Sequence, residues 1–408
     1  MSLNEGNATV TAETQASGAD THGKLNQHPA PDVPASYRVG VSVDANIGAR
    51  RTMEDAHAFI YDFAGLKGQG YFAVFDGHAG KKAAEYCGLH FHEHLLANLA
   101  KTPDTSIPHL LNATFHSVDT ALSELSAAEG SHSGCTAVTC LLRLEDEQGN
   151  PVGEGSGVGP GVRTTKGELE GKAGEACEAA RQAGIDPAEG KPGSSGTASP
   201  QMQRSSDPAP GQVGSGAGGV KEKLRNMFSG SPKSISPSSS SGSGAASPAT
   251  QVSGSATEIK AAKRTLYTAN AGDARAVLAR GGQAIRLSYD HKGTDTKEIQ
   301  RIEAAGGYVQ NQRVNGYLAV TRSLGDSQMK QFVVGSPYTT ETTIRPEDDY
   351  LIVACDGLWD VCSDQQAVDL IKGAQSAQEA SDKLRNYAMS HHTSDNLSVL
   401  VVDLNPKH

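Results

Sequence analysis

The sequence reads GYFAVFDGH over residues 70–78, an apolar run that ends at an acidic residue. Aromatic and aliphatic side chains dominate residues 70–75, which is typical of a short strand. Asp76 and Gly77 then form the kind of pair that closes a strand in a turn. A single pair of this kind is usually only a turn, so its interpretation depends on the rest of the chain.

Acidic residues stand at similar points elsewhere. Asp273 and Asp356 each follow a predicted strand, and Asp395 lies in the loop before the last one. If these strand ends converge, several carboxylates share one small volume and raise one another's pKa unless a cation neutralises them. Ligand sets made only of oxygen favour a hard divalent ion such as Mg²⁺ or Mn²⁺. Together the residues predict a divalent metal site, although each one alone would be read as a turn.

Periodicity predicts the remaining strands and helices around this stretch. Strands are predicted over residues 37–44, 56–63, 136–144, 264–270, 275–279, 283–288, 350–355 and 397–404. Helices are predicted over residues 80–101, 107–128 and 296–305, and after Ser363 and Ser376. The last three helices begin with the spacing of a capping box, in which Ser or Asp is followed three residues later by Glu or Gln. Neighbouring strands with consecutive helix pairs favour the α+β class over a doubly wound sheet.

Composition divides the chain of 408 residues into one folded domain and two low-complexity segments. Residues 1–36 are polar without periodicity, so we expect a disordered N-terminal tail. The domain is predicted over residues 37–404, interrupted at about 145–260 by a segment rich in Gly, Ser, Pro and Ala. Such a composition buries too little apolar area to offset the entropy of ordering. We therefore expect a disordered insertion carried by a hairpin.

Net charge, cysteine content and hydropathy indicate which partners and which cellular location to expect. The formal net charge is -10 and we find no basic stripe, which disfavours a nucleic-acid partner. The 6 cysteines include no CxxC pair, so buried free thiols in a reducing compartment are favoured over disulfides or metal ligands. No window approaches the roughly 18 apolar residues that span a bilayer, and the start resembles no targeting segment. We expect no membrane partner and a cytoplasmic or nuclear location, or both.

Several other catalytic designs lack their defining motifs. No Cys is followed by five residues and Arg, and no GxSxG, HExxH or GxxxxGK[ST] motif occurs. Cysteinyl-phosphate, serine-hydrolase, zincin and P-loop mechanisms are therefore excluded. His90, His92 and His94 suggest a metal site at first sight, but they lie on an amphipathic helix with unsuitable spacing. A solvated helix face is the favoured interpretation of this histidine cluster.

Eight short motifs resemble, in the same order, those of the type 2C protein phosphatases, the metal-dependent PPM family. They read RRTMED at 50–55, FDGHAG at 75–80, SGCTA at 133–137, NAGDAR at 270–275, VNG at 314–316, TRSLGD at 321–326, CDGLWD at 355–360 and SDN at 394–396. The likeness covers about residues 37–404 apart from the insertion. It implies a four-layer α/β/β/α sandwich of two antiparallel sheets flanked by helix pairs, with metals in a cleft at one edge.

The resemblance also assigns the ligands of two divalent ions. Asp76 would bridge both ions. Glu54 and the carbonyl of Gly77 would complete the protein ligands of one ion, and Asp356 and Asp395 those of the other. The expected cofactors are therefore two Mg²⁺ or Mn²⁺ ions, which lower the pKa of a water molecule so that it attacks phosphorus directly.

The family's other functional positions are present as well. Arg50 would hold the substrate phosphate through its planar fork. His78 would protonate the departing seryl or threonyl oxygen as a general acid. Asp55 would orient water from beyond the metal ligands. Asp273 and Asp360 match residues that can hold a third, weaker ion in this family.

The resemblance implies a protein serine/threonine phosphatase that acts on phosphoserine and phosphothreonine in phosphoprotein substrates. We expect a monomer that negatively regulates kinase signalling, with stress-pathway kinases as candidate partners. One alternative is a catalytically inactive phosphatase-like binding module, but such modules typically lose a metal carboxylate or the phosphate-binding Arg, and none is missing here. A second alternative is a scaffold that acts through residues 145–260, in which case deletion of that segment would abolish biological activity while catalysis survives.

Overall fold

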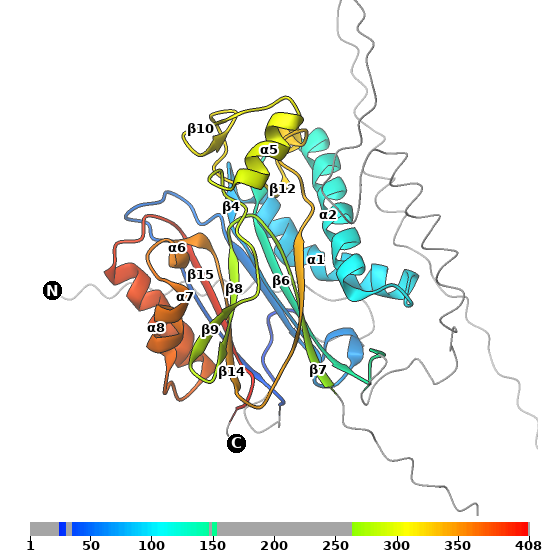
Figure 1. Cartoon of the computed structure of the whole chain (residues 1–408), viewed down its shortest axis with the longest axis vertical. Helices are drawn as coiled ribbons and strands as arrows, with labels where there is room; N and C mark the ends of the chain where they lie inside the picture. Colours follow the sequence, from blue (N-terminus) through cyan, green and yellow to red (C-terminus); the bar gives the residue numbers. More distant parts are fainter. Residues whose placement is uncertain (1–23, 30–34, 147–148, 153–262, 407–408) are drawn as a thin grey trace, which may run out of the picture. The chain divides into compact units, whose positions relative to one another are not determined.

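The computed structural model describes residues 24–29, 35–146, 149–152 and 263–406 (Figure 1). The chain divides into two compact units, Met1–Leu169 with Ile259–His408 and Glu170–Glu258. The second unit lies wholly outside the described residues. Most of the expected disordered insertion and most of the expected N-terminal tail also lie outside them. The strand Ala137–Glu145 and an isolated bridge between Glu145 and Pro151 continue ordered structure past the predicted start of the insertion at about residue 145.

Two five-stranded antiparallel sheets form the centre of this unit. The first has the order β1 (Arg38–Asp44), β15 (Leu397–Asp403), β14 (Asp348–Ala354), β8 (Arg275–Arg280) and β9 (Gln283–Arg286). The second has the order β13 (Tyr338–Thr343), β7 (Lys263–Ala271), β6 (Ala137–Glu145), β3 (Gly70–Phe75) and β2 (Ala56–Tyr61). The predicted α+β class is confirmed. Strand β13 was not predicted, because its sequence YTTETT is polar and its residues are only partly buried or exposed.

Strand β3 shows why the sheets stack in layers. All of its residues are buried, so both of its faces are covered. Phe72 and Val74 belong to the core between the two sheets. Tyr71, Ala73 and Phe75 belong to the core that includes residues of the first two helices. The two-residue period of a strand thus divides one apolar run between two cores.

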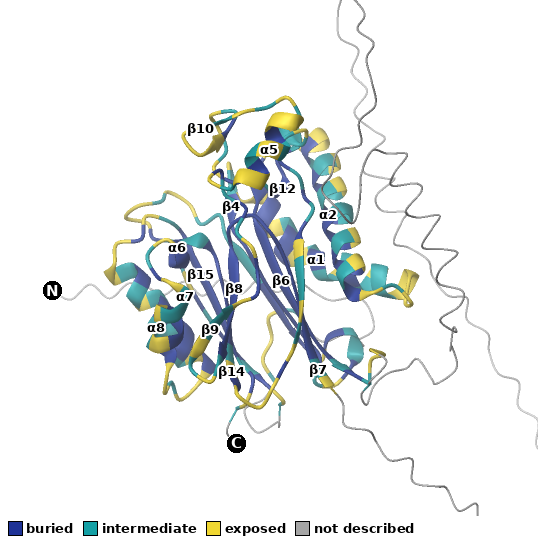
Figure 2. Cartoon of the chain, in the orientation of Figure 1, coloured by how far each residue is buried: buried dark blue, intermediate teal, exposed yellow. Residues whose placement is uncertain are grey.

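Helix pairs cover the outer face of each sheet (Figure 1). Helices α1 (Lys82–Lys101) and α2 (Ile107–Glu129) share the core of the second sheet. Helices α7 (Asp364–Ile371) and α8 (Ala377–Ser390) share the core of the first sheet. Their buried faces turn inward and their exposed faces outward (Figure 2). The expected four-layer α/β/β/α sandwich is therefore confirmed.

The remaining described elements are short and connect these layers. They are the helices α5 (Thr296–Ala304) and α6 (Asp356–Trp359), the 3-10 turns η1 (Phe63–Gly65) and η2 (Ser327–Met329), and the two-residue strands β4 (Gly77–His78), β5 (Gly134–Cys135), β10 (Val309–Gln310), β11 (Arg313–Val314) and β12 (Leu324–Gly325). None of the two-residue strands was predicted, because two residues show no periodicity. Among the described residues, every helix is too short or too polar to span a bilayer.

The capping boxes expected at three helix starts are only partly realised. At α7 the box is complete, since Ser363 accepts from the backbone of Gln366 and the Gln366 side chain accepts from the backbone of Ser363. At α5 the Asp295 side chain caps the helix, but the Glu298 carboxylate accepts from Arg322 instead. At α8 the Ser376 side chain caps the helix, but the Glu379 carboxylate accepts from the backbone N–H of Gln375 instead of that of Ser376. Sequence spacing thus located each helix start, while the partner of the side chain three residues later differs among the three helices.

Residues 24–29 differ from the expected flexible tail. The backbone N–H of Asn26 donates to the carbonyl of Phe59 at 2.8 Å, and the N–H of Phe59 donates to Asn26 Oδ1 at 2.9 Å. The ring of His28 lies 4.8 Å from that of Phe59. Strand β2 is an edge strand, so this short segment occupies backbone groups that would otherwise be unpaired.

The cysteines in the described part of the chain agree with the sequence analysis. Cys87, Cys135, Cys140, Cys355 and Cys362 are all buried and free. The sixth, Cys177, lies outside the described residues.

Gly40 permits the close approach of α8 to strand β1 and provides a test of the packing. A Cβ at this position would collide with the backbone of Ala377 and Gln378. Gly40→Ala should therefore lower the free energy of unfolding by about 1–3 kcal/mol, the usual cost of overpacking. The measurement is chemical denaturation followed by circular dichroism.

Gly48→Ala is the matched control, because a Cβ there would meet no atom within 4 Å. It should change the free energy of unfolding by less than about 0.5 kcal/mol. Equal denaturation midpoints for the two variants would contradict the close packing of α8 on β1.

Candidate metal centre and active site

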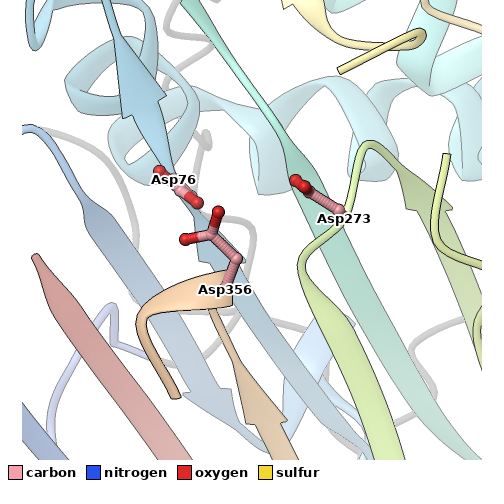
Figure 3. Close-up of side chains that lie close together, drawn as sticks. All are labelled: Asp76, Asp273 and Asp356. Atoms are coloured by element: carbon pink, nitrogen blue, oxygen red, sulfur yellow. The ribbon is translucent and has the colours of Figure 1, made fainter. Parts of the chain in front are cut away.

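Three aspartates from separate parts of the chain meet at one edge of the sandwich. Asp76 follows β3, Asp273 lies in the turn between β7 and β8, and Asp356 begins α6 directly after β14. One carboxylate oxygen from each lies within 4.8 Å of the others. Figure 3 shows the three side chains pointing toward a common space. The expected convergence of strand ends is thus present, and these residues could hold a metal ion.

The electrostatics of this trio fit a cation. Asp76 and Asp273 are only 8% and 5% exposed. Burial, and then the charge of Asp356, raises the pKa of Asp76 well above its usual value. Burial, and then the charge of Asp273, does the same for the pKa of Asp356. Carboxylates in such a place either hold protons or face a positive ion that keeps them charged.

Unpaired oxygens at the same place support the cation. Asp273 Oδ1, Asp356 Oδ1 and Asp55 Oδ2 are buried and have no hydrogen-bond partner within the described residues. Buried polar atoms are rarely left without a partner, and an ion or its water ligands would satisfy them. Burial is also the main cause that raises the pKa of Asp55 to about 6. The charge of Asp55 also contributes to the raised pKa of Asp76, so Asp55 lies near the trio.

Arg50 and Asp395, both predicted site residues, form an ion pair next to the trio. Arg50 Nη2 lies 2.5 Å from Asp395 Oδ1. Burial lowers the pKa of Arg50, but the charges of Asp395, Asp76 and Glu54 outweigh it and the pKa is raised. The Arg50 side chain is 37% exposed, so its guanidinium is accessible from solvent.

Glu54 and Gly77 are held together through their backbones. A Cβ at Gly77 would collide with the carbonyl oxygen of Glu54, so only glycine allows this approach. The backbone N–H of Glu54 donates to Asn396 Oδ1 at 2.9 Å, which ties the segment to the loop that carries Asp395. Among the described residues, Glu54 and Asp395 do not belong to the group within 4.8 Å, whereas Asp273 does. The three carboxylates that lie within 4.8 Å of one another therefore differ from the carboxylates predicted to bind the two ions.

Lys292 is a site residue that sequence reasoning missed. Its Nζ lies 3.1 Å from Asp360 Oδ1 and 3.6 Å from Asp273 Oδ2. Burial lowers the pKa of Lys292, but the charges of Asp273 and Asp360 raise it overall. Asp273 and Asp360, which the resemblance assigns to a third ion, therefore both lie close to the ammonium group of Lys292. No local pattern marks Lys292, because only the tertiary fold places it between these two carboxylates.

Asp326 is the second residue that was missed. His78 Nε2 lies 2.8 Å from Asp326 Oδ2, and Ser323 Oγ bonds the same carboxylate oxygen. Asp326 stands inside the TRSLGD motif, so the sequence contained a signal but no role for it.

The histidine cluster on α1 forms ordinary side-chain contacts. His90 bonds Glu93 at 2.9 Å, and His94 bonds Tyr86 at 3.0 Å. Of the residues that the structure describes, only the aspartate trio forms a group suited to a metal ion. His92 Nδ1 is buried without a hydrogen-bond partner among the described residues, so the interpretation of this cluster as a solvated helix face stays a prediction.

Solved structures share the fold of this chain. A phosphatase from a pathogenic strain of Toxoplasma gondii has a TM-score of 0.54 at 22% identity, covering 90% of this chain and 93% of that one. A serine-threonine phosphatase 2C from Toxoplasma gondii has a TM-score of 0.54 at 14% identity, covering 93% and 99%. At these identities the likeness concerns the fold alone.

Sequence comparison extends the likeness to a family. The family model described as Protein phosphatase 2C matches residues 39–146 and 217–397. Protein phosphatase 2C homolog 1 of Saccharomyces cerevisiae is 34% identical over 94% of this chain and 99% of its own length. The Schizosaccharomyces pombe protein of the same name is 32% identical over 92% of this chain and 75% of its own length. The chain therefore belongs to the protein phosphatase 2C family and is a protein serine/threonine phosphatase.

Proposed function

We propose that this chain hydrolyses phosphoserine and phosphothreonine in phosphoproteins by direct attack of water at a centre of two Mg²⁺ or Mn²⁺ ions. The observation that carries the proposal is the trio Asp76, Asp273 and Asp356, whose carboxylate oxygens lie within 4.8 Å of one another. When bound, the ions supply the positive charge that makes water nucleophilic at neutral pH.

The residues proposed to hold the ions come from both sheets. Asp76 would serve both ions, in keeping with its position beside Asp356. Glu54 and the Gly77 carbonyl would serve one ion, and their backbone contact supports this pairing. Asp356 and Asp395 would serve the other ion.

Arg50 would bind the substrate phosphate through two parallel N–H donors. Its side chain is 37% exposed, and its present partner Asp395 is one of the proposed ligands. The ion pair between Arg50 and Asp395 would therefore separate on binding. Arg50 would then bind the phosphate, and Asp395 would bind the ion. Asp55 would orient a water molecule through its unpaired oxygen, in accordance with its place beside the trio.

Asp273 and Asp360 would hold a third, weaker ion. Lys292 already neutralises part of their charge, which agrees with a weaker site. We also propose that the protein is a monomer in the cytoplasm or nucleus. It would act as a negative regulator of kinase signalling, with stress-pathway kinases as partners. These rest on the family resemblance and, for the location, on the buried free cysteines.

The class of reaction is tested by phosphate release from a phosphothreonine peptide. We expect release with Mn²⁺, none with EDTA, and no inhibition by okadaic acid, a toxin directed at the phosphoprotein phosphatases. A protein that binds the peptide without releasing phosphate under any of these conditions would instead be a phosphatase-like binding module.

The metal centre is tested by Asp76→Asn, which removes a charge shared by both ions. Turnover should fall at least about 100-fold while the protein stays folded. Asp356→Asn should behave similarly. Asp273→Asn should be milder, because Lys292 already neutralises part of the Asp273 charge.

Steady-state kinetics across a range of Mn²⁺ concentrations, with calorimetric titration of Mn²⁺, give both turnover and affinity for each variant. Near-normal turnover of Asp76→Asn at saturating Mn²⁺ would show that the two-ion assignment is wrong.

The general-acid role of His78 is tested by changing the leaving group. A seryl or threonyl oxygen needs a proton as it departs, whereas nitrophenolate does not. His78→Gln should therefore lose about 100-fold on a phosphothreonine peptide and much less on nitrophenyl phosphate. If His78 only supports the loop around Gly77, both substrates should slow alike and the apparent Mn²⁺ affinity should weaken.

A further inference from the structure

A small sheet brings Asp326 to His78 across 248 residues of sequence. Strand β5 pairs with β4 on one side and with β12 on the other. Gly134 is therefore the register partner of His78 and also of Gly325. Asp326 directly follows Gly325, so this arrangement places its side chain beside the His78 ring.

The carboxylate of Asp326 is buried and packed closely against strand β5. A Cβ at Gly134 would collide with both Asp326 oxygens, so the carboxylate lies directly on the backbone of β5. The Asp326 backbone is left-handed, with φ at 46°. Asp326 is 8% exposed and Ser323 is fully buried. A group with so little freedom holds its hydrogen-bond partner in one orientation.

The hydrogen bond from His78 is made through one ring nitrogen. Nε2 lies 2.8 Å from Asp326 Oδ2, and Ser323 Oγ bonds that same oxygen. The other ring nitrogen, Nδ1, has no hydrogen-bond partner in the described part of the chain. The His78 side chain is 22% exposed, so part of the ring is accessible from solvent.

We propose that Asp326, oriented by Ser323, is the positioning residue of the general acid His78. This inference rests on the proposed function, in which His78 protonates the leaving group. Asp326 keeps the proton on Nε2 and fixes the plane of the ring, so that Nδ1–H faces the departing oxygen. A positioning partner of this kind acts only where a proton must be delivered in a defined direction.

Each proton that moves during the hydrolysis step has a defined donor and acceptor. Water oxygen forms a bond to phosphorus, and the bond between phosphorus and the seryl or threonyl oxygen breaks with its electron pair on that oxygen. Nδ1 of the protonated His78 ring gives its proton to the same oxygen, while the other ring proton stays on Nε2 in its hydrogen bond to Asp326. The attacking water releases one proton, which restores Nδ1–H for the next turnover.

Asp119 provides a matched control for damage to the same segment. Its Oδ1 accepts from the backbone N–H of Gly325 at 2.9 Å and from Lys330 at 2.8 Å. Asp119 thus supports β12 and the following turn, as Asp326 does, but it makes no contact with His78 among the contacts that the described residues show. A loss caused only by a loosened β12 should appear in Asp119→Asn as well.

The experiment compares two substrates across five variants of the full chain at saturating Mn²⁺. The variants are Asp326→Asn, Ser323→Ala, His78→Gln, the double variant Asp326→Asn with His78→Gln, and Asp119→Asn. The substrates are a phosphothreonine peptide and nitrophenyl phosphate, and thermal unfolding confirms that each variant is folded.

Asp326→Asn should lower kcat on the peptide about 10- to 100-fold, as partners behind a functional group usually do, with little change on nitrophenyl phosphate. The double variant should be no slower on the peptide than His78→Gln, because the two residues act as one unit. Asp119→Asn should affect both substrates equally. Ser323→Ala should show the selectivity of Asp326→Asn to a smaller degree, and it decides the question if Asp326→Asn does not fold.

Two failures can be told apart. Equal losses of Asp326→Asn on both substrates, beside a selective loss of His78→Gln, would overturn the positioning role and leave the proposed function intact. Equal losses of His78→Gln on both substrates would overturn the general-acid role itself, and the inference would fall with it. Additive losses in the double variant would also overturn the inference.

Discussion

Mutual repulsion among buried carboxylates is the constraint around which this structure is organised. Asp76, Asp273 and Asp356 lie within 4.8 Å of one another, and their pKa values are raised mainly by burial. A folded protein keeps such a group only if the gain from bound cations offsets the cost of collecting the charges. The site therefore favours metal binding, and the surrounding fold must be rigid enough to hold the acids in place.

The sandwich supplies that rigidity. Strand β3 is buried along its whole length and ends at Phe75, directly before Asp76, while β14 is packed between β15 and β8 and ends at Ala354, shortly before Asp356. Asp76 and Asp356 thus follow buried strands, and Asp273 lies in the short turn that joins β7 to β8. Such placement is expected to fix the positions of the ligands, which a catalytic metal centre requires.

A second set of residues orients the first. Asn396 holds the backbone of Glu54, Lys292 lies between Asp273 and Asp360, and Asp326 bonds His78. These contacts join segments that are far apart in the chain. The acidic residues and His78 stand in motifs that resemble those of the family. The contacts around them support the proposed roles in metal binding, phosphate binding and proton delivery.

Local patterns in the sequence were enough to predict the long helices and strands and the acidic residues of the centre. The strand over 70–75 and the helix starts follow from local periodicity and capping, which depend on neighbours a few residues apart. No local pattern showed which carboxylates lie within 4.8 Å of one another, that Lys292 lies beside Asp273, or that Asp326 bonds His78. The physical reason is that these contacts arise from strand pairing between distant segments, and two-residue strands such as β4, β5 and β12 leave no periodic signal in the sequence.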